Sequence, residues 1–592
     1  MPTLTTRTRW LIGGGIAVAA VAVVAIAVFV LGARPVPEAL KYLPADSVVV
    51  GELRADIPGD QLGHLGNLLA HFPGFKDQST LATKLDQAFD RLLSDQTGGA
   101  TSYTRDVKPW LAGPTFIGLA APGPGATPPA SPGAGTPAAM AAEGALLVAT
   151  TDGSAVCERA LAGSVGASET YLGVTITKNA GGELGCALDG RYALIGSPAR
   201  IRAGLDAHRA GNGMDRVAQY AQARDALGGD RLATVYLSSA AAARLVAADP
   251  SLPISAVNGL AALPAWAIAG IRAEDDALVA DIVVAPAASG QGGASAGAPT
   301  QATVSLPPPH ASQVAAFVPG DAIALAELHG IGATAQNALG ALRADPQFQS
   351  AAAQLDSALA LAGGPEALVG WIDDAAIVVL PDHTGSATPG LTAGFVLVAH
   401  DDASAAAKAT QLRSVLSLLA LSSGNAPVDE TIEGVTVTTI DLGDLGTLLN
   451  AAGGAGGLGS IGGLPIPTDA HVKLTIAARG RLLLFGGDDA FARAVLGVDA
   501  GSTLADQSAY RHAVARGAEQ NLGQVYLAGA ALRDLAGRFI PPDQIDRWRT
   551  DLLPYAAPVE SLLITTTTTN GLSRTRIVVS VATPDATATG TP

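Results

Sequence analysis

Residues 187–196 read ALDGRYALIG and residues 477–486 read AARGRLLLFG, so one pattern occurs twice at an offset of 290 residues (477 − 187). The match extends without a gap over Leu184–Leu245 and Leu474–Leu535. A unit of this length that recurs in one chain predicts two structurally similar domains. The repeat therefore decides the expected architecture before any functional motif is considered.

Further matched positions lie outside the gapless block at smaller offsets. The offset is 275 near the start of the copies (319 − 44) and 261 farther along (371 − 110), which indicates loops of different length. The largest difference is the Gly-rich segment 443–469, which we interpret as an insertion in the second copy. Copy 1 then spans residues 37–287 and copy 2 spans residues 312–582. The positions that recur are Pro44 and Pro319, Trp110 and Trp371, Gly190 and Gly480, and Tyr236 and Tyr526.

The N-terminus carries the longest apolar run of the chain. Residues 10–32 begin WLIGGGIAVAAVAVVAIAVFVL and contain no charged residue, and this length can cross a bilayer as a helix. Arg7 and Arg9 precede the run, so the positive-inside rule predicts a cytoplasmic segment 1–9 and an extracytoplasmic location for the rest. Cleavage after Ala33, as in a secretory signal, is the alternative.

Both copies read as mixtures of helices and strands. Short apolar stretches separated by turn residues predict strands joined by hairpins, as at Asn570-Gly571. We therefore expect an α+β fold in which two duplicated copies of a mainly antiparallel sheet, with helices segregated to one face, follow one N-terminal transmembrane helix.

Segments rich in Gly, Ala, Pro or Thr interrupt this pattern. Their composition cannot bury enough apolar surface to offset the entropy of ordering, so we expect loops, linkers and tails there. Besides the insertion, they are the loop 122–142, the linker 288–311 and the tail 583–592.

The charge of the chain restricts its partners. The formal net charge is −16 at pH 7, and the acidic residues are spread along the sequence. An acidic surface repels phosphate backbones, so nucleic acid is not an expected partner. The expected partners are the lipid bilayer, through residues 10–32, and an envelope protein or ligand that the sequence does not identify.

Two short motifs resemble catalytic or cofactor signatures but stand in the wrong context. GASAG at 293–297 spells a nucleophile elbow, which needs a strand before the serine and a helix after it, yet the motif lies in the linker. GLGSIG at 457–462 spells a dinucleotide loop, but the GLPIP that follows cannot open a helix cleanly. The nine histidines show no metal-binding spacing. The sequence thus predicts no catalytic residue, cofactor or metal site.

Both cysteines, Cys157 and Cys186, lie in copy 1, and Ile476 occupies the position of Cys186 in copy 2. Cysteines outside the cytoplasm commonly oxidise. Cys157 is expected on a helix and Cys186 on a strand of the same unit, and a bridge requires their Cα atoms to lie within about 7 Å. A disulfide and two buried free thiols both remain possible at this point.

The matched aromatic residues have two interpretations. Trp110 and Trp371 each follow the helical segment of their copy, and Tyr236 and Tyr526 lie within predicted strands. A ring that stacks on a sugar or a partner would be exposed, whereas one that pins helices to a sheet would be buried. Recurrence in both copies favours the core role.

Several stretches together resemble a known family. They are Leu43-Pro44-Ala45-Asp46 before the first strand, Lys108-Pro109-Trp110-Leu111 after the helices, Tyr171-Leu172-Gly173-Val174 before a strand, and the block from Ala187 to Leu237. With these and the anchor, the chain resembles the bacterial envelope proteins of domain-of-unknown-function family 3352. Ala112 departs from the family's Trp motif, which tends to continue directly into Gly. The resemblance implies a fold and an envelope location but no activity.

Three functions compete on this basis. The anchor, the duplicated body and the missing catalytic signature favour a non-catalytic binding or scaffolding role in the bacterial cell envelope. The first alternative is an envelope hydrolase whose site is assembled from dispersed residues of one copy. The second is a passive spacer or adhesive ectodomain.

Overall fold

The computed structural model describes the chain between residues 37 and 582, with gaps. The described residues are 37–54, 60–97, 99, 102–120, 144–151, 153, 155–161, 164–241, 264–286, 306–344, 349–350, 353, 356, 364–381, 390–422, 426–444, 460–461, 464–465 and 471–582. Among them, no helix is both long and apolar enough to cross a membrane. Outside them lie the predicted segments 1–9, 10–32, 122–142 and 583–592, and most of 288–311 and 443–469.

The chain divides into two compact units. The main boundary falls between Gly293 and Ala294, inside the predicted linker. Unit 1 comprises Met1–Gly293, Thr569–Arg574 and Thr583–Pro592, and unit 2 comprises Ala294–Thr568 and Thr575–Ala582.

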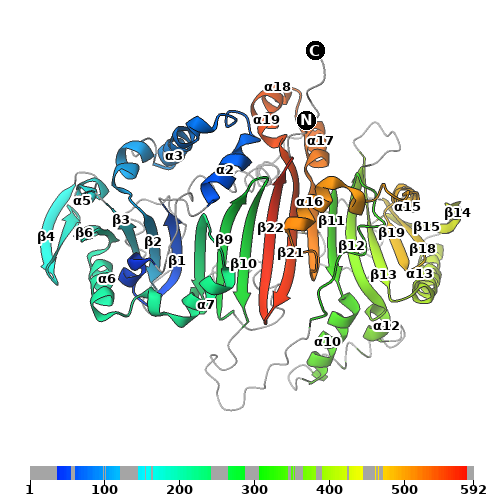
Figure 1. The fold of residues 1–592 in the computed structure, drawn as a ribbon. Coiled ribbons are helices and arrows are strands. Elements are labelled where there is room, and N and C mark those ends of the chain that lie inside the picture. Colours follow the sequence, from blue (N-terminus) through cyan, green and yellow to red (C-terminus); the bar gives the residue numbers. More distant parts are fainter. Residues whose placement is uncertain are drawn as a thin grey trace. The chain divides into compact units, whose positions relative to one another are not determined.

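An antiparallel sheet forms the centre of unit 1 (Figure 1). Its described strands lie in the order β4-β5-β6-β7-β3-β2-β1-β8-β9-β10, and each neighbouring pair is antiparallel. The strands are β1 Ser47–Arg54, β2 Pro114–Ala120, β3 Ala145–Thr150, β4 Val165–Tyr171, β5 Val174–Asn179, β6 Gly185–Asp189, β7 Tyr192–Gly196, β8 Ala233–Ser238, β9 Trp266–Glu274 and β10 Ala277–Ala285.

Unit 2 has a sheet of the same kind. Its described strands lie in the order β14-β15-β18-β19-β13-β12-β11-β20-β21, and β21 continues into β22 through Asn570-Gly571. The strands are β11 Ala324–His329, β12 Ile372–Pro381, β13 Leu391–Ala399, β14 Val428–Ile432, β15 Val435–Asp444, β18 His471–Arg479, β19 Leu482–Gly486, β20 Gly523–Ala528, β21 Val559–Thr569 and β22 Leu572–Val581, with β16 Ser460–Ile461 and β17 Leu464–Pro465 as a separate pair.

The strand orders of the two units correspond. When the described strands of each main sheet are taken in chain order, without the separate β16–β17 pair, the fourth lies at one edge of the sheet. The first strand lies between the second and the eighth, as β1 between β2 and β8 and as β11 between β12 and β20. A mixed fold of helices and antiparallel sheet, as expected from the sequence, is thereby confirmed.

Helices cover both faces of the unit 1 sheet, so the expectation of helices on one face was wrong. Ala187 and Cys186 are neighbours on β6 and therefore point to opposite faces. Ala187 belongs to a core cluster with Ile201 of α6 (Pro198–Ala210), whereas Cys186 belongs to a second cluster that packs on α5 (Val156–Ala160). The physical reason is that central strands such as β3 are apolar on both sides, which is typical of strands covered on both faces.

The same arrangement recurs in unit 2. Leu483 of β19 lies in a cluster with Ala409 of α13 (Asp402–Ser422). Gly486, on the opposite face of β19, lies so close to α15 (Asp489–Leu496) that an added Cβ would come within 3.0 Å of Phe491. Each sheet is thus a middle layer between helices.

Local sequence signals account for several helix ends. Pro198 occupies the first turn of α6, the Ser197 hydroxyl accepts the Arg200 N–H, and Gly211 ends the helix at φ 64°. The other α-helices are α2 Gln61–Ala70, α3 Leu81–Thr97, α7 Ala218–Leu227, α10 Ile331–Ala344, α12 Pro365–Val369, α16 Ser508–Arg516, α17 Gly529–Phe539, α18 Ile545–Arg547 and α19 Leu553–Ala556. Shorter helical turns are η1 Glu38–Tyr42, η2 Gln78–Thr80, η3 Tyr103–Val107, η4 Lys108–Trp110, η5 Met214–Arg216, η7 Leu504–Asp506 and η8 Trp548–Leu552.

Candidate functional site

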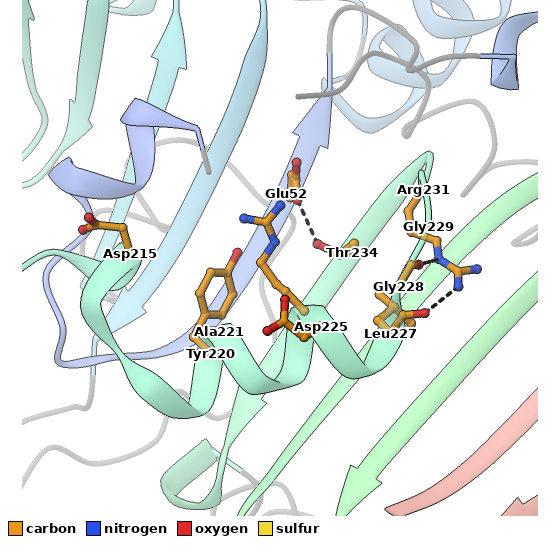
Figure 2. Close-up of a pocket in the computed structure, with 11 residues that line it drawn as sticks. Glu52, Asp215, Tyr220, Ala221, Asp225, Leu227, Gly228, Gly229, Arg231 and Thr234 are labelled. Atoms are coloured by element: carbon orange, nitrogen blue, oxygen red, sulfur yellow. Dashed lines mark hydrogen bonds between the residues drawn. The ribbon is translucent and has the colours of Figure 1, made fainter. Parts of the chain in front are cut away.

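Unit 1 contains a pocket between α7 and the centre of its sheet (Figure 2). The cavity volume is about 410 Å³, which is within the range of small-molecule sites. Strands β1 and β8 form its inner end, and α7 with the Gly-Gly turn after it forms its rim. The lining residues are Glu52, Asp215, Tyr220, Ala221, Arg224, Asp225, Leu227, Gly228, Gly229, Arg231 and Thr234.

A carboxylate and a hydroxyl meet at the inner end of the pocket. Glu52 of β1 and Thr234 of β8 are register partners, and the Thr234 hydroxyl donates a hydrogen bond of 3.2 Å to Oε2 of Glu52. The Glu52 residue is only 2 % exposed. Burial of a carboxylate is costly, and packing alone would favour an apolar residue in the middle of a sheet. Glu52 is therefore the lining residue that most strongly suggests binding.

Arg231 closes one wall of the pocket and ties the end of α7 to the sheet. Its guanidinium donates to Oδ2 of Asp281 and to the Leu227 carbonyl, both at 2.8 Å, and to the Gly228 carbonyl at 3.0 Å. Asp281 is fully buried and also accepts from Arg272 at 2.7 Å. Burial lowers the pKa of Arg231 to about 10, and the nearby Asp281 opposes this shift. The side chain therefore stays charged at neutral pH and acts as a structural part of the wall.

Unit 2 fills the corresponding place with a longer side chain. Glu327 of β11 is the register partner of Gln524 of β20, as Glu52 is of Thr234. The Gln524 amide donates to Oε2 of Glu327 at 3.0 Å and to the Tyr510 hydroxyl at 2.7 Å, and so connects the two. Because threonine is shorter than glutamine, unit 1 keeps space where unit 2 has an amide.

The pocket presents polar groups of both charges. Asp215 and Asp225 contribute carboxylates, Arg224 a guanidinium and Tyr220 a phenol. These side chains can donate and accept hydrogen bonds, so the pocket can hold a small polar molecule.

The family of the chain follows from its sequence. The model of the family "Protein of unknown function (DUF3352)" matches residues 9–581, nearly the whole chain. The chain belongs to the DUF3352 family. The resemblance seen in the short sequence stretches is thereby confirmed, and the match includes both units.

Comparisons with individual proteins contribute little to this DUF3352 chain. No curated protein matches it. Among solved structures, crystal form I of TP0453 is 8% identical with a TM-score of 0.23, covering 45% of this chain and 82% of TP0453. Crystal form III is 9% identical with a TM-score of 0.23, covering 46% and 84%. Similarity at this level carries no argument about function.

Four of the matched positions of the DUF3352 chain shape its backbone. Pro44 and Pro319 each form an isolated antiparallel bridge just before the first strand of their unit. Gly190 and Gly480 have φ of 59° and 57° in the turns β6–β7 and β18–β19. This left-handed conformation favours glycine, so the two glycines shape the turns, and the two prolines serve the fold through their bridges.

The matched tyrosines pack helices on the sheets. Tyr236 meets Tyr220 of α7 edge to face, with ring centroids 5.2 Å apart, and Tyr526 meets Tyr510 of α16 in the same way at 5.1 Å. All four rings are buried. In unit 1 this contact also fixes the position of Tyr220 in the pocket wall.

The two matched tryptophans, Trp110 and Trp371, follow helical segments of their units. Trp110 ends η4, and its side chain lies outside the described part of the structure. Trp371 is half-buried; its indole N–H donates to the Leu368 carbonyl at 2.7 Å, and its ring packs on the cluster beneath α13. Trp371 thus contributes to packing while it remains in contact with solvent.

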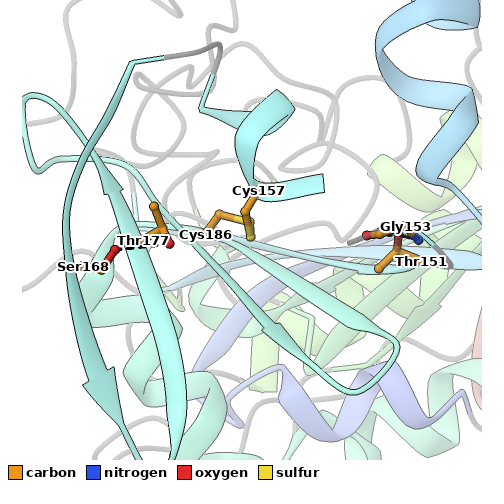
Figure 3. Close-up of a disulfide and its surroundings, with 6 residues drawn as sticks. All are labelled: Thr151, Gly153, Cys157, Ser168, Thr177 and Cys186. Atoms are coloured by element: carbon orange, nitrogen blue, oxygen red, sulfur yellow. Dashed lines mark hydrogen bonds between the residues drawn. A yellow bond between two sulfur atoms is a disulfide. The ribbon is translucent and has the colours of Figure 1, made fainter. Parts of the chain in front are cut away.

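Cys157 and Cys186 form a disulfide that joins α5 to β6 (Figure 3). Their Cα atoms are 5.2 Å apart, and 29 residues separate them in sequence. Ile476, at the matched position of unit 2, is buried in the cluster beneath α13. At this position, unit 2 thus has an apolar contact and unit 1 has a disulfide.

Sequence reasoning missed Glu52 and Glu327, although a signal was present. Both follow a small residue and precede leucine within an apolar strand, at the matched offset of 275 (327 − 52). A charged residue that recurs at the centre of a predicted strand indicates a buried polar site. Thr234 could not be found in this way, because its role depends on strand register.

Proposed function

We propose that this chain is a non-catalytic binding protein of the bacterial cell envelope. Residues 10–32 would anchor it in the membrane, and residues 37–582 would lie on the outer side. The observation that carries the proposal is the unit 1 pocket with the buried Glu52–Thr234 pair at its inner end. The ligand we propose is a small polar molecule that both donates and accepts hydrogen bonds, because the lining combines carboxylates, guanidinium groups and hydroxyls.

The proposal includes a gene duplication that left the two units with different roles. The common strand order and the two tyrosine pairs support a shared origin. In this view unit 1 retains a ligand pocket, whereas Gln524 of unit 2 fills the equivalent space and stabilises the core.

The location rests on separate arguments. The uncharged run at 10–32 and the arginines before it favour a single-pass anchor with a cytoplasmic N-terminus. The disulfide between Cys157 and Cys186 supports an oxidising compartment for the body of the protein.

The substitution Thr234→Gln tests the pocket. It introduces the residue that unit 2 carries at the same register position, so the fold should tolerate it while the new amide occupies the cavity. The full-length protein in detergent would be screened by thermal shift against free amino acids, dipeptides and monosaccharides, since a ligand that binds the folded state raises Tm. We expect the shift seen with wild type to be lost in Thr234→Gln.

The matched control is Gln222→Ala, because Gln222 is exposed on α7 and does not line the pocket. This variant should keep the full ligand-induced shift. If Thr234→Gln also kept it, the ligand would bind elsewhere and the pocket would not be the site.

A further inference from the structure

Three side chains that are distant in sequence meet inside unit 2: His310, His329 and Asp374. His329 ends β11 and is the register partner of Asp374 on β12, and His310 forms an isolated bridge with Asn521. One ligand atom of each of the three lies within 4.8 Å of the other two. Asp374 and His329 are buried, whereas the side chain of His310 is 33% exposed and gives access from solvent.

Backbone carbonyls orient both imidazoles. Nδ1 of His329 lies 2.8 Å from the Asn521 carbonyl, and Nδ1 of His310 lies 2.9 Å from the Ala311 carbonyl. A carbonyl oxygen only accepts, so each Nδ1 carries a proton, and each Nε2 is the ring atom that can bind a metal when it is unprotonated. The rings stack with centroids 4.4 Å apart, and Nε2 of His310 lies 3.2 Å from Oδ1 of Asp374. Histidines that bind metals are held in this way, with the second nitrogen donating to a carbonyl.

The centre of the cluster contains polar atoms that the protein leaves without hydrogen bonds. Oδ2 of Asp374 and Nε2 of His329 are both buried and have no hydrogen-bond partner among the described residues. Oδ1 of Asp374 accepts the N–H of Gly330 at 3.1 Å. A metal ion would satisfy both buried atoms at once.

We propose that His310, His329 and Asp374 bind a divalent transition-metal ion, and that Zn²⁺ is the preferred ion. Two imidazole nitrogens and one carboxylate form a donor set common for zinc and also suited to iron or manganese. Metal–ligand distances are about 2.0–2.2 Å, so a small rotation of the partly exposed His310 would bring the donors together. Three protein ligands leave at least one coordination position for water or for Glu327, whose Oε1 lies 3.3 Å from Nε2 of His329.

The site would belong to unit 2 alone. The register pair that corresponds to His329 and Asp374 is Arg54 and Pro114 in unit 1, and neither of these residue types is a common metal ligand. The proposal therefore does not depend on the unit 1 pocket or its ligand. It also differs from the sequence prediction of no metal site, because spacing along the chain does not report residues from three separate segments.

A bound proton is the competing explanation of the cluster. His329 would then be charged between Glu327 and Asp374, and no metal would be needed. The two cases can be separated because only a metal site gives stoichiometric and saturable binding of an ion.

The experiment uses the full-length protein without a histidine tag, stripped with a chelator and titrated with ZnSO₄ and, separately, with CoCl₂. We expect about one Zn²⁺ per chain by elemental analysis after gel filtration, and d–d absorption bands with Co²⁺. His310→Ala should weaken Zn²⁺ binding by at least about 100-fold, since loss of a direct ligand should exceed the 10–100-fold effect of outer-shell changes. Asp374→Asn, which keeps the side-chain shape, should do the same, with circular dichroism to verify folding.

His64→Ala is the matched control, because His64 is a partly exposed histidine of unit 1 that pairs with Asp275. It should bind Zn²⁺ as wild type does. The proposal is overturned if stripped wild-type protein takes up no stoichiometric Zn²⁺, or if His310→Ala binds it with unchanged affinity.

Discussion

At the scale of single residues, the informative groups are the carboxylates buried in the two sheets. Glu52 accepts from a threonine hydroxyl and Glu327 from a glutamine amide. Asp281 accepts from two arginines, and Asp374 accepts one backbone N–H with a second oxygen left over. Apolar side chains are sufficient to form the core of a fold. Each buried carboxylate therefore marks either a structural ion pair or a candidate site.

Arg231→Met tests the structural ion pair. The change removes one cation from the fully buried Asp281 and releases the end of α7, so we expect the free energy of unfolding to fall by about 3 kcal/mol. Urea unfolding followed by circular dichroism measures this. The double variant Arg231→Met with Asp281→Leu should recover only part of the loss, because it removes the buried carboxylate but leaves Arg272 with Glu274 as its remaining acidic partner. Lys41→Ala, which removes an exposed pair with Glu38, should leave the midpoint unchanged.

At the scale of elements, α5 illustrates how short segments depend on tertiary contacts. Its five residues are too few for a stable isolated helix, and its side chains offer little apolar surface beyond the buried Val156. The disulfide to β6 holds α5 in place, which its length and helix propensity alone would not do. In unit 2 the longer α13 packs over Ile476 and needs no such link.

Cys157→Ala should therefore affect α5 before the rest of unit 1. A cross-link across 29 residues contributes roughly 3–4 kcal/mol by restricting the unfolded chain. We expect the amides of Val156–Ala160 to exchange with deuterium faster in this variant, measured by mass spectrometry, while the amides of β20 keep their wild-type rates. Unchanged exchange in α5 would show that packing alone holds the helix.

At the scale of the whole molecule, two sheets with the same strand order carry different polar centres. Unit 1 has the pocket beside Glu52, and unit 2 has the cluster of His310, His329 and Asp374. Hairpins and glycine turns set the strand order in each sheet, and this order does not depend on the polar side chains. The two units therefore differ in chemistry although their strand order is the same.

The proposed membrane orientation predicts a protease pattern in intact cells. Trypsin added outside should digest the segment 37–582 and leave a short N-terminal fragment that contains residues 1–32. Immunoblotting with a tag fused at residue 1 detects that fragment. Permeabilised cells are the control, in which the tag should also be lost. Protection of the body in intact cells would contradict the outside location.

The sequence by itself determined the mixed α and β class and the antiparallel hairpins, and it pointed to positions such as Gly190 and Tyr236, because these depend on local patterns of apolar, turn and aromatic residues. Only the tertiary structure decided which faces of the sheets are covered, that Cys157 meets Cys186, and that Thr234 lies beside Glu52 and His310 beside Asp374. These facts depend on strand register and on contacts between segments far apart in the chain. Periodicity along the sequence carries no information about either, because neighbours in a sheet are set by long-range pairing.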